Sequence, residues 1–195
     1  PIYYENIHFI ILASDLDYTK NSEQMKLLED DLVKANNNSK IKWKIVLIHK
    51  PMIYKDYYVK NDPGLTNGVA LKEGLQPTLD AYGVDMIISG HAHLYERSFP
   101  LKFNNVLTSN EKSTYIDPEG AIHVIVGTAG ADKHHNQYPQ TFEEWAVVKN
   151  PDVYGFFNLR IPDDKNRLIF EFITNEGYVL DQFQIFETDD SFKTK

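Results

Sequence analysis

Three histidines of this sequence stand directly behind apolar segments, where their rings could bind a metal ion. His49 follows the run WKIVLI, and His91 and His93 follow VDMIIS and Gly90. An apolar run closed by glycine is typical of a buried strand, and polar side chains just beyond such strands gather at the rim of a sheet. Residues i and i+2 of an extended chain point to the same side, so the rings of His91 and His93 can converge. Three neutral imidazoles at one edge predict a Zn or Fe site, in preference to three half-buried histidines that bond separately to the backbone.

The charge of such a site limits how many ions these residues can hold. Imidazole ligands are neutral, so two metal ions about 3.5–4 Å apart need carboxylates or hydroxide between them. The acids near a suitable strand end are Asp15 and Asp17. Unless these two side chains turn inward, the 195 residues are predicted to hold at most one metal ion tightly.

The remaining histidines are predicted to have other roles. His8 and His123 lie inside expected strands, which favours structural roles. His134 and His135 lie in a loop after Gly130, where solvated side chains are commoner than side chains that line a substrate pocket.

Two short motifs near the histidines have alternative interpretations. The adjacent residues Glu96 and Arg97 are expected to form an ion pair that fixes the loop carrying His91 and His93, called the histidine loop below. The alternative is that the guanidinium holds an oxyanion. The segment GTAG, residues 127–130, could offer backbone N–H groups to an anion, although a tight exit from a strand explains these glycines equally well.

The first hundred residues contain the elements that would position the histidines. Apolar runs predict strands over 7–13, 43–48 and 84–89, separated by helical segments. The first helix follows from Met25, Leu28, Leu32 and Ala35 on one face, with Asn21 and Gln24 as a capping box. A second helix is expected to begin near Gln76, with Pro77 in its first turn, and to end at Gly83. This order favours parallel strands joined by right-handed crossovers.

The second half of the chain has a different pattern. A turn-rich loop is predicted over 101–120, followed by strands at 121–130, 154–161, 167–174 and 179–187 without helices between them. Short links predict antiparallel hairpins, and alternation places Leu168, Phe170 and Phe172 on one buried face. We therefore expect an α/β (α+β) fold, with parallel βαβ units followed by antiparallel strands, in which both halves share one core.

Composition excludes several classes of protein. A hydrophobic content of 42% and an aromatic content of 13% are too high for disorder. The net charge of -8 argues against a nucleic-acid partner, because phosphate backbones select basic surfaces. No apolar run approaches the ~20 residues of a membrane span. The absence of cysteine excludes disulfides and thiolate metal sites.

The first residues lack a signal-peptide pattern and enter a strand at once, so the numbering could begin inside a larger domain.

Two motifs resemble a known family. VLIHKPMIY, followed by GVDMIISGHAHLYER, is similar to the last two metal motifs of the purple acid phosphatases, which are calcineurin-like metallophosphoesterases. Their patterns are V-x-x-H and G-H-x-H, often extended to Y-E-R. The segment SEQMKLLEDDL resembles the family's S-x-Q-x-x-W-L-E, and the closing strands also look similar. The family's earlier motifs, D-x-G, G-D-x-x-Y and G-N-H-D/E, are missing, and SDLDY at 14–18 stands in the wrong order to replace them.

The resemblance implies that residues 1–195 are the C-terminal part of a single metallophosphoesterase catalytic domain, half of an α-β-β-α sandwich. It implies that His49 and His91 bind one metal ion and His93 the other, in a dinuclear centre of Fe(III) with Fe(II), Zn(II) or Mn(II). The implied activity is that of an acid phosphatase that cleaves phosphate monoesters with a metal-bound hydroxide. The family's catalytic histidine would lie upstream, so the isolated chain is expected to be inactive. The expected partners are a small phosphorylated substrate, the missing N-terminal half and, in one possible assembly, a second subunit of a homodimer. The expected location is secreted or lysosomal/vacuolar.

Two rival functions come from other classes. One is a mononuclear zinc hydrolase or hydratase with three histidine ligands and an open water position, which needs nothing upstream. The other is a non-catalytic half-domain that serves as a binding or structural partner and whose histidines hold no metal.

Overall fold

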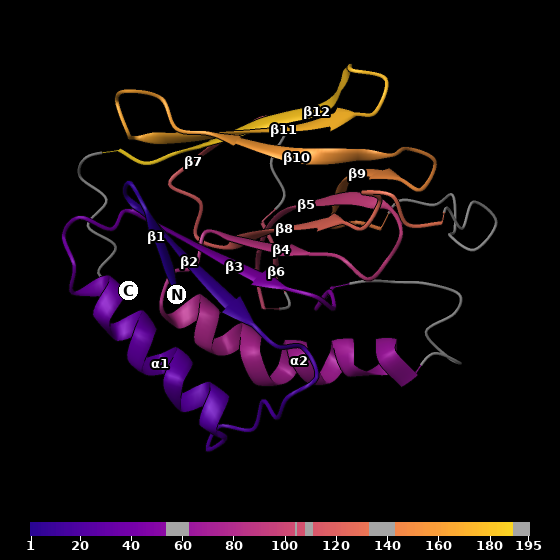
Figure 1. The fold of residues 1–195 in the computed structure, drawn as a ribbon. Helices are drawn as coiled ribbons and strands as arrows, with labels where there is room; N and C mark the ends of the chain where they lie inside the picture. The colour runs from indigo at the N-terminus through magenta and orange to yellow at the C-terminus, as the bar shows by residue number, and fades with distance from the viewer. Residues whose placement is uncertain (54–62, 104, 108–110, 133–142, 189–195) are drawn as a thin grey trace.

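The computed structural model describes residues 1–53, 63–103, 105–107, 111–132 and 143–188, which form three layers (Figure 1). Helices α1 and α2 cover one face of a large sheet, and a smaller sheet packs on its other face (Figure 1). Within these residues the large sheet has the order β1-β2-β3-β4-β8-β5-β6 with β9 paired to β5, and the small sheet has the order β10-β11-β12-β7. The predicted α/β fold with both parallel and antiparallel strands is confirmed.

The bounds of the elements are as follows. The large sheet contains β1 (Ile2–Tyr4), β2 (Ile7–Leu12), β3 (Trp43–Ile48), β4 (Met86–Ser89), β5 (Tyr95–Lys102), β6 (Asn105–Val106), β8 (Ala121–Val126) and β9 (Ala146–Asn150). The small sheet contains β7 (Thr114–Ile116), β10 (Gly155–Arg160), β11 (Arg167–Thr174) and β12 (Val179–Phe186). The helices are α1 (Glu23–Asn36) and α2 (Pro63–Ala81). Neither of these two helices is long and apolar enough to span a membrane.

The centre of the large sheet is parallel, as predicted for β2, β3 and β4. β2 pairs with β3, β3 with β4 and β4 with β8, all in the same direction. Helices α1 and α2 form the two crossovers, and with the small sheet opposite they bury both faces of these strands. This explains the nearly continuous apolar runs, since parallel strands covered on both sides have no solvent face to fill with polar residues.

Helix α1 has the predicted buried face but a different cap. Met25, Leu28, Leu32 and Ala35 are all buried. The N-cap is Ser22, whose hydroxyl accepts a hydrogen bond from the Met25 N–H, so the prediction of Asn21 was wrong by one residue. Gln24 also has another role, because its side-chain amide exchanges hydrogen bonds with the backbone of Ala13 after β2.

Helix α2 is longer than predicted. It begins at Pro63 instead of near Gln76, and Pro77 lies inside it. Proline favours the first turn of a helix, but the complete burial of Leu75 and Leu79 on either side keeps this segment helical despite the lost backbone hydrogen bond. The end at Gly83 is as predicted: its φ is 64°, and the Gly83 and Val84 N–H groups cap the carbonyls of Asp80 and Leu79.

The region around residue 100 differs most from the prediction. Residues 95–102 form β5, and the predicted loop over 101–120 contains β6 and β7. The strand expected over 121–130 is β8, which runs parallel to β4 and antiparallel to β5. The prediction of antiparallel pairing throughout the second half was therefore wrong for β8. β4 and β5 are consecutive in the chain, but β8 lies between them in the sheet. The histidine loop, which joins β4 to β5, therefore passes over the end of β8.

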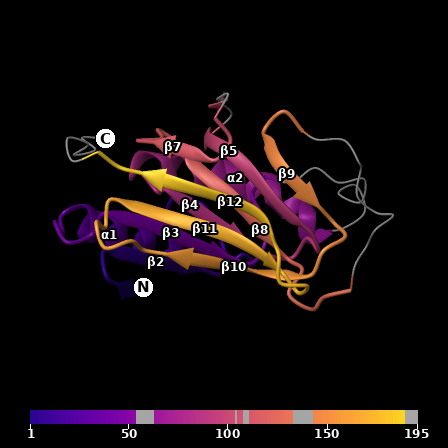
Figure 2. The ribbon, with the colours of Figure 1, turned by 90° about the horizontal axis from the view of Figure 1, so that it is seen from above.

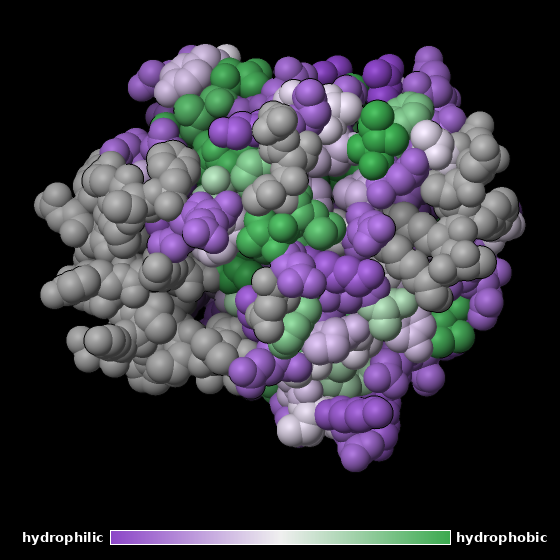
Figure 3. Space-filling model, turned by 180° about the vertical axis from the view of Figure 1, so that it is seen from behind, coloured by the Kyte–Doolittle hydropathy of each residue, from purple (hydrophilic) through white to green (hydrophobic). Residues whose placement is uncertain are grey.

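The small sheet forms the predicted hairpins and closes one core. β10, β11 and β12 are antiparallel in sequence order. Leu168, Phe170 and Phe172 on β11 are fully buried, and they belong to one cluster with Ile45 and Met86 of the large sheet. Seen from above, β10–β12 lie over the strands of the large sheet (Figure 2). From behind, hydrophilic side chains surround small apolar areas (Figure 3).

Candidate metal centre

The structure brings two of the three predicted metal ligands together. His49 directly follows β3 and His91 lies two residues beyond β4, and the last residues of these strands, Ile48 and Ser89, are register partners. The Gly90 N–H donates to the His49 carbonyl over 3.0 Å, so the two strand exits run side by side. The Nδ1 atom of His91 lies 3.2 Å from Nε2 of His49, and the rings meet edge to face with centroids 5.1 Å apart.

The spacing of these two nitrogen atoms suits a single metal ion. Two imidazole ligands at roughly 2.0–2.1 Å from a tetrahedral ion place their nitrogens about 3.3 Å apart. His91 also has a φ of 62°, in the left-handed region that side chains other than glycine rarely adopt. Such backbone conformations persist where their surroundings hold them, and they cluster at functional sites.

His93 is oriented by the backbone. Its Nδ1 lies 2.8 Å from the carbonyl oxygen of Asp132, which can only accept, so Nδ1 carries a proton and the neutral ring has its lone pair on Nε2. Metal-binding histidines commonly donate their second ring N–H to a carbonyl in this way. Within the described residues, no group of three His, Asp or Glu side chains is close enough to hold an ion. His93 is therefore not grouped with the other two.

The two acids near the strand ends interact with other groups. Asp15 forms an ion pair with Lys50, and the hydrogen bond from that ammonium is the main reason why the pKa of Asp15 is lowered. Asp17 accepts hydrogen bonds from the Thr19 N–H and hydroxyl at 2.8 and 2.9 Å, which lower its pKa as well. In this arrangement Asp15 lies close enough to His49 to interact electrostatically, while Asp17 stabilises its own turn.

A close backbone contact explains why residue 127, the first of the GTAG segment, is glycine. A Cβ at this position would lie 1.8 Å from the Ala92 carbonyl oxygen and 2.7 Å from its carbon. The Gly127 N–H donates to the Leu94 carbonyl at 3.1 Å. The histidine loop thus passes directly against the end of β8, at a distance that only glycine allows.

The predicted ion pair between Glu96 and Arg97 was wrong. Both residues lie on β5, where successive side chains point to opposite faces. Arg97 is buried and donates two hydrogen bonds to Asp181 of β12, at 2.6 and 2.9 Å. Glu96 faces Lys149 of β9 at 3.6 Å, and burial raises its pKa to about 7. A buried arginine with these partners is not positioned to hold an oxyanion.

The sequence analysis did not single out Asp181, although the alternation of residues along β12 indicates that it is buried. Residues 181, 183 and 185 alternate along β12, and all three are buried. An aspartate on the inward face between apolar residues requires a buried partner. That partner, Arg97, lies 84 residues away, so no local pattern links the two.

The other histidines lie where their strands place them. His8 is fully buried and bonds to Asp31 of α1 through Nε2 at 2.7 Å. His123 is buried in β8, and this burial lowers its pKa to about 3 and keeps the ring neutral. His134 and His135 lie outside the described residues.

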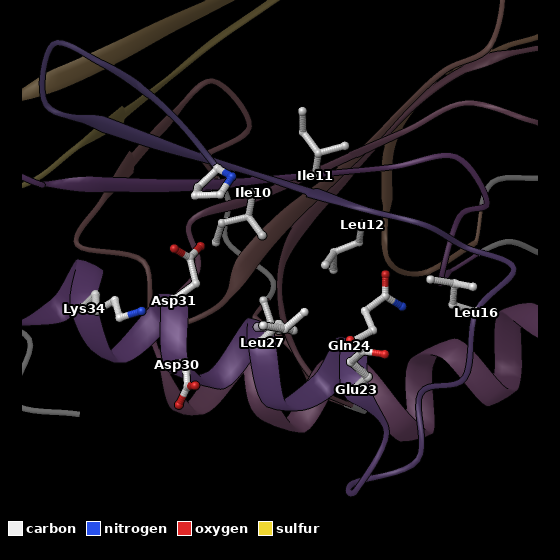
Figure 4. A pocket seen from close by; sticks show the side chains of 12 residues that line it. Ile10, Ile11, Leu12, Leu16, Glu23, Gln24, Leu27, Asp30, Asp31 and Lys34 are labelled. Atoms are coloured by element: carbon white, nitrogen blue, oxygen red, sulfur yellow. The ribbon is translucent and has the colours of Figure 1, made fainter.

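A cleft of about 630 Å³ lies elsewhere, between β2 and α1. Figure 4 shows Ile10 and Leu12 of the strand pointing toward side chains of the helix, whereas Ile11 points away from it. The described residues that line this cleft include no histidine, so it is separate from the candidate metal centre.

Two family models match the chain. Residues 4–95 match the calcineurin-like phosphoesterases, and residues 120–182 match the iron/zinc purple acid phosphatase-like protein C family. The first match includes all three predicted ligands, and the second includes Gly127 and Asp181.

Individual proteins support the same relationship. The chain is 33% identical, over 93% of its length, to a protein of Arabidopsis thaliana named probable inactive purple acid phosphatase 1, and it covers 29% of that protein. It is 31% identical, over 71% of its length, to acid phosphatase type 7 of Homo sapiens, of which it covers 33%. The structure of purple acid phosphatase PPD1 from yellow lupin seeds superimposes with a TM-score of 0.79 and 30% identity, covering 95% of this chain and 32% of that one. The chain thus spans about a third of the length of these relatives, and it belongs to the purple acid phosphatases of the calcineurin-like phosphoesterase family.

Proposed function

We propose that this chain is the C-terminal part of the catalytic domain of an acid phosphatase, which hydrolyses phosphate monoesters at a dinuclear metal site. The observation that carries the proposal is the contact between His49 and His91, whose ring nitrogens lie 3.2 Å apart at the exits of two parallel strands. Membership of a phosphoesterase family supports the reaction class.

The residues of this chain would hold and orient the metal ions. His49 and His91 would bind one ion and His93 the other, with the tautomer of His93 fixed by the Asp132 carbonyl. When bound, the metal ions would be Fe(III) with Fe(II), Zn(II) or Mn(II), and they would neutralise the phosphate and lower the pKa of water. Neutral imidazoles leave this positive charge available, which a chain with a net charge of -8 needs in order to bind an anionic substrate.

The rest of the site would come from the N-terminal half of the domain. The chain covers about a third of its relatives, and the family's catalytic histidine belongs to the motifs that these 195 residues lack. We therefore expect the isolated chain to bind metal weakly and to be inactive. A secreted or lysosomal/vacuolar location fits the exposed sequon Asn37-Asn38-Ser39, which follows α1.

A non-catalytic role is the second candidate. The Arabidopsis relative is named a probable inactive purple acid phosphatase, and His49 and His91 form a pair rather than a group of three ligands within the described residues. A protein of this kind would retain the fold as a structural or binding partner.

The test measures phosphate release from a generic monoester by the complete gene product, together with its metal content. We expect two metal ions per chain, and His91→Ala and His93→Ala should each remove nearly all activity while the protein remains folded. Unchanged turnover in both variants contradicts the proposal. A single tightly bound zinc ion would favour a mononuclear hydrolase, and a metal-free, inactive protein would favour the non-catalytic role.

A further inference from the structure

The buried carboxylate of Asp181 on β12 connects the small sheet to the beginning of β5, next to the histidine loop. Asp181 accepts hydrogen bonds from the Tyr95 hydroxyl at 2.7 Å and from Nε and Nη2 of Arg97 at 2.6 and 2.9 Å. All three residues are buried, with Tyr95 and Arg97 at most 2% exposed. Water therefore competes little for these hydrogen bonds, and the ionised partners make them strong.

The guanidinium of Arg97 is held from several directions. Its Nη1 donates to the Tyr115 hydroxyl at 2.9 Å, and Nη2 also donates to the Lys112 carbonyl at 3.1 Å. Its plane lies over the Phe183 ring, with Cζ 4.3 Å from the centroid. Arg97 belongs to the large sheet, whereas Tyr115 and Phe183 belong to the small one, so these contacts fix the beginning of β5 against the opposite layer.

His93 lies only two residues before this contact. His93 is followed by Leu94 and then Tyr95, the first residue of β5. The loop is irregular: the Ala92 N–H donates to the Gly90 carbonyl at 2.7 Å and the Leu94 N–H to the Ala92 carbonyl at 2.8 Å. A short loop of this kind, with a left-handed residue at His91, depends on what holds its two ends.

We propose that Asp181 is a positioning residue for the metal ligands His91 and His93. It holds Tyr95 and Arg97, and through them it fixes the end of the loop that presents both rings. This inference rests on the proposed metal site. Stability alone would not require the charge, because apolar residues of similar volume can replace a buried ion pair with little loss. The carboxylate instead supplies directed hydrogen bonds that set one orientation of the strand.

Glu171 provides a matched control. It lies on β11 of the same small sheet and also accepts three hydrogen bonds, from Asn158, Arg160 and Gln182, each at 3.1 Å. None of these partners lies on β5. Glu171→Gln should therefore weaken the small sheet without reaching the histidine loop.

The experiment compares Asp181→Asn with Glu171→Gln in the complete gene product. Hydrogen exchange of the Ala92 and Leu94 amides is measured in the metal-free protein, and zinc release to a chelator is measured in the loaded protein. In Asp181→Asn we expect exchange and zinc release to become faster by roughly tenfold to hundredfold, the factor for a lost hydrogen bond to a charged group. Glu171→Gln should change neither rate more than about twofold.

A milder variant keeps the test decisive if Asp181→Asn fails to fold. Tyr95→Phe removes one of the three hydrogen bonds and keeps the ring stacked on Phe172, whose centroid is 4.0 Å away. Its loop amides should exchange about fivefold faster. Parental exchange and zinc release in the variants, with only a lower free energy of unfolding, would overturn the proposal. If the parent binds no zinc, the proposed function fails, while the amide exchange still decides whether Asp181 positions the loop.

Discussion

Replacing Gly127 by alanine should displace the histidine loop further than a metal site tolerates. The added Cβ would lie 1.8 Å from the Ala92 carbonyl oxygen, whereas side-chain carbons essentially never approach such atoms within 3.0 Å. The end of β8 and the loop must therefore separate by about 1.2 Å. Because Ala92 stands between His91 and His93, its displacement moves both rings.

The size of this movement predicts the loss of binding. Bonds between protein ligands and metal ions keep their lengths to within about 0.2 Å. A shift several times larger should therefore move at least one histidine nitrogen out of bonding distance of the metal ion. We expect metal affinity to fall by at least about a hundredfold. Relaxation around the extra methyl group should also lower the free energy of unfolding by about 1–3 kcal/mol.

Gly120→Ala is the control for stability. A Cβ at Gly120 would lie 2.4 Å from the Leu101 carbonyl oxygen, a comparable clash at the opposite end of the same strand. Metal affinity is measured by competition with a chelator, and stability by urea unfolding of the metal-free protein. Gly120→Ala should lose stability and keep its metal affinity. The reasoning is refuted if Gly127→Ala binds metal as the parent does, or if Gly120→Ala loses as much affinity.

Two further predictions concern stability. Burial raises the pKa of Glu96 from 4.5 to about 7, so the folded state retains a proton that the unfolded chain loses, and stability should fall as the pH rises from about 4.5 to 7. Glu96→Gln should remove this slope, worth about 3 kcal/mol, in urea unfolding at pH 5 and 8; identical slopes in both proteins would disprove it. Ser22→Ala should cost about 1 kcal/mol of unfolding free energy because it removes the α1 cap, whereas Asn21→Ala should cost almost nothing; equal losses would contradict the assignment.

The sequence predicted the elements whose signals are local. The apolar runs ending before His49 and Gly90 are strands, and the spacing of Met25 and Leu32 marks the buried face of α1. Such patterns depend on neighbours within a few residues, so a single sequence reveals them. The contact between His49 and His91 follows from the same reasoning, because parallel strands end at one edge.

The sequence did not predict β5, because the polar residues of this strand depend on partners far away in the chain. β5 is buried along nearly its whole length although Glu96, Arg97 and Ser98 are polar, and their partners on β9, β12 and β8 lie far away in the chain. Without those partners the segment reads as a loop. The beginning of α2 was not predicted because PGLTNG contains residues that favour turns over helices.

The position of β8 between β4 and β5 sets an order of events on the ribosome. β4 and β5 emerge with the histidine loop between them, but the strand that separates them, Ala121–Val126, has yet to be made. At ~5–20 residues per second the nascent chain carries its histidines for roughly two to six seconds before that strand exists. Asp181 follows Arg97 by 84 residues, so its contact forms later still. The geometry proposed to bind metal is therefore complete only after β8 and β12 have been synthesised.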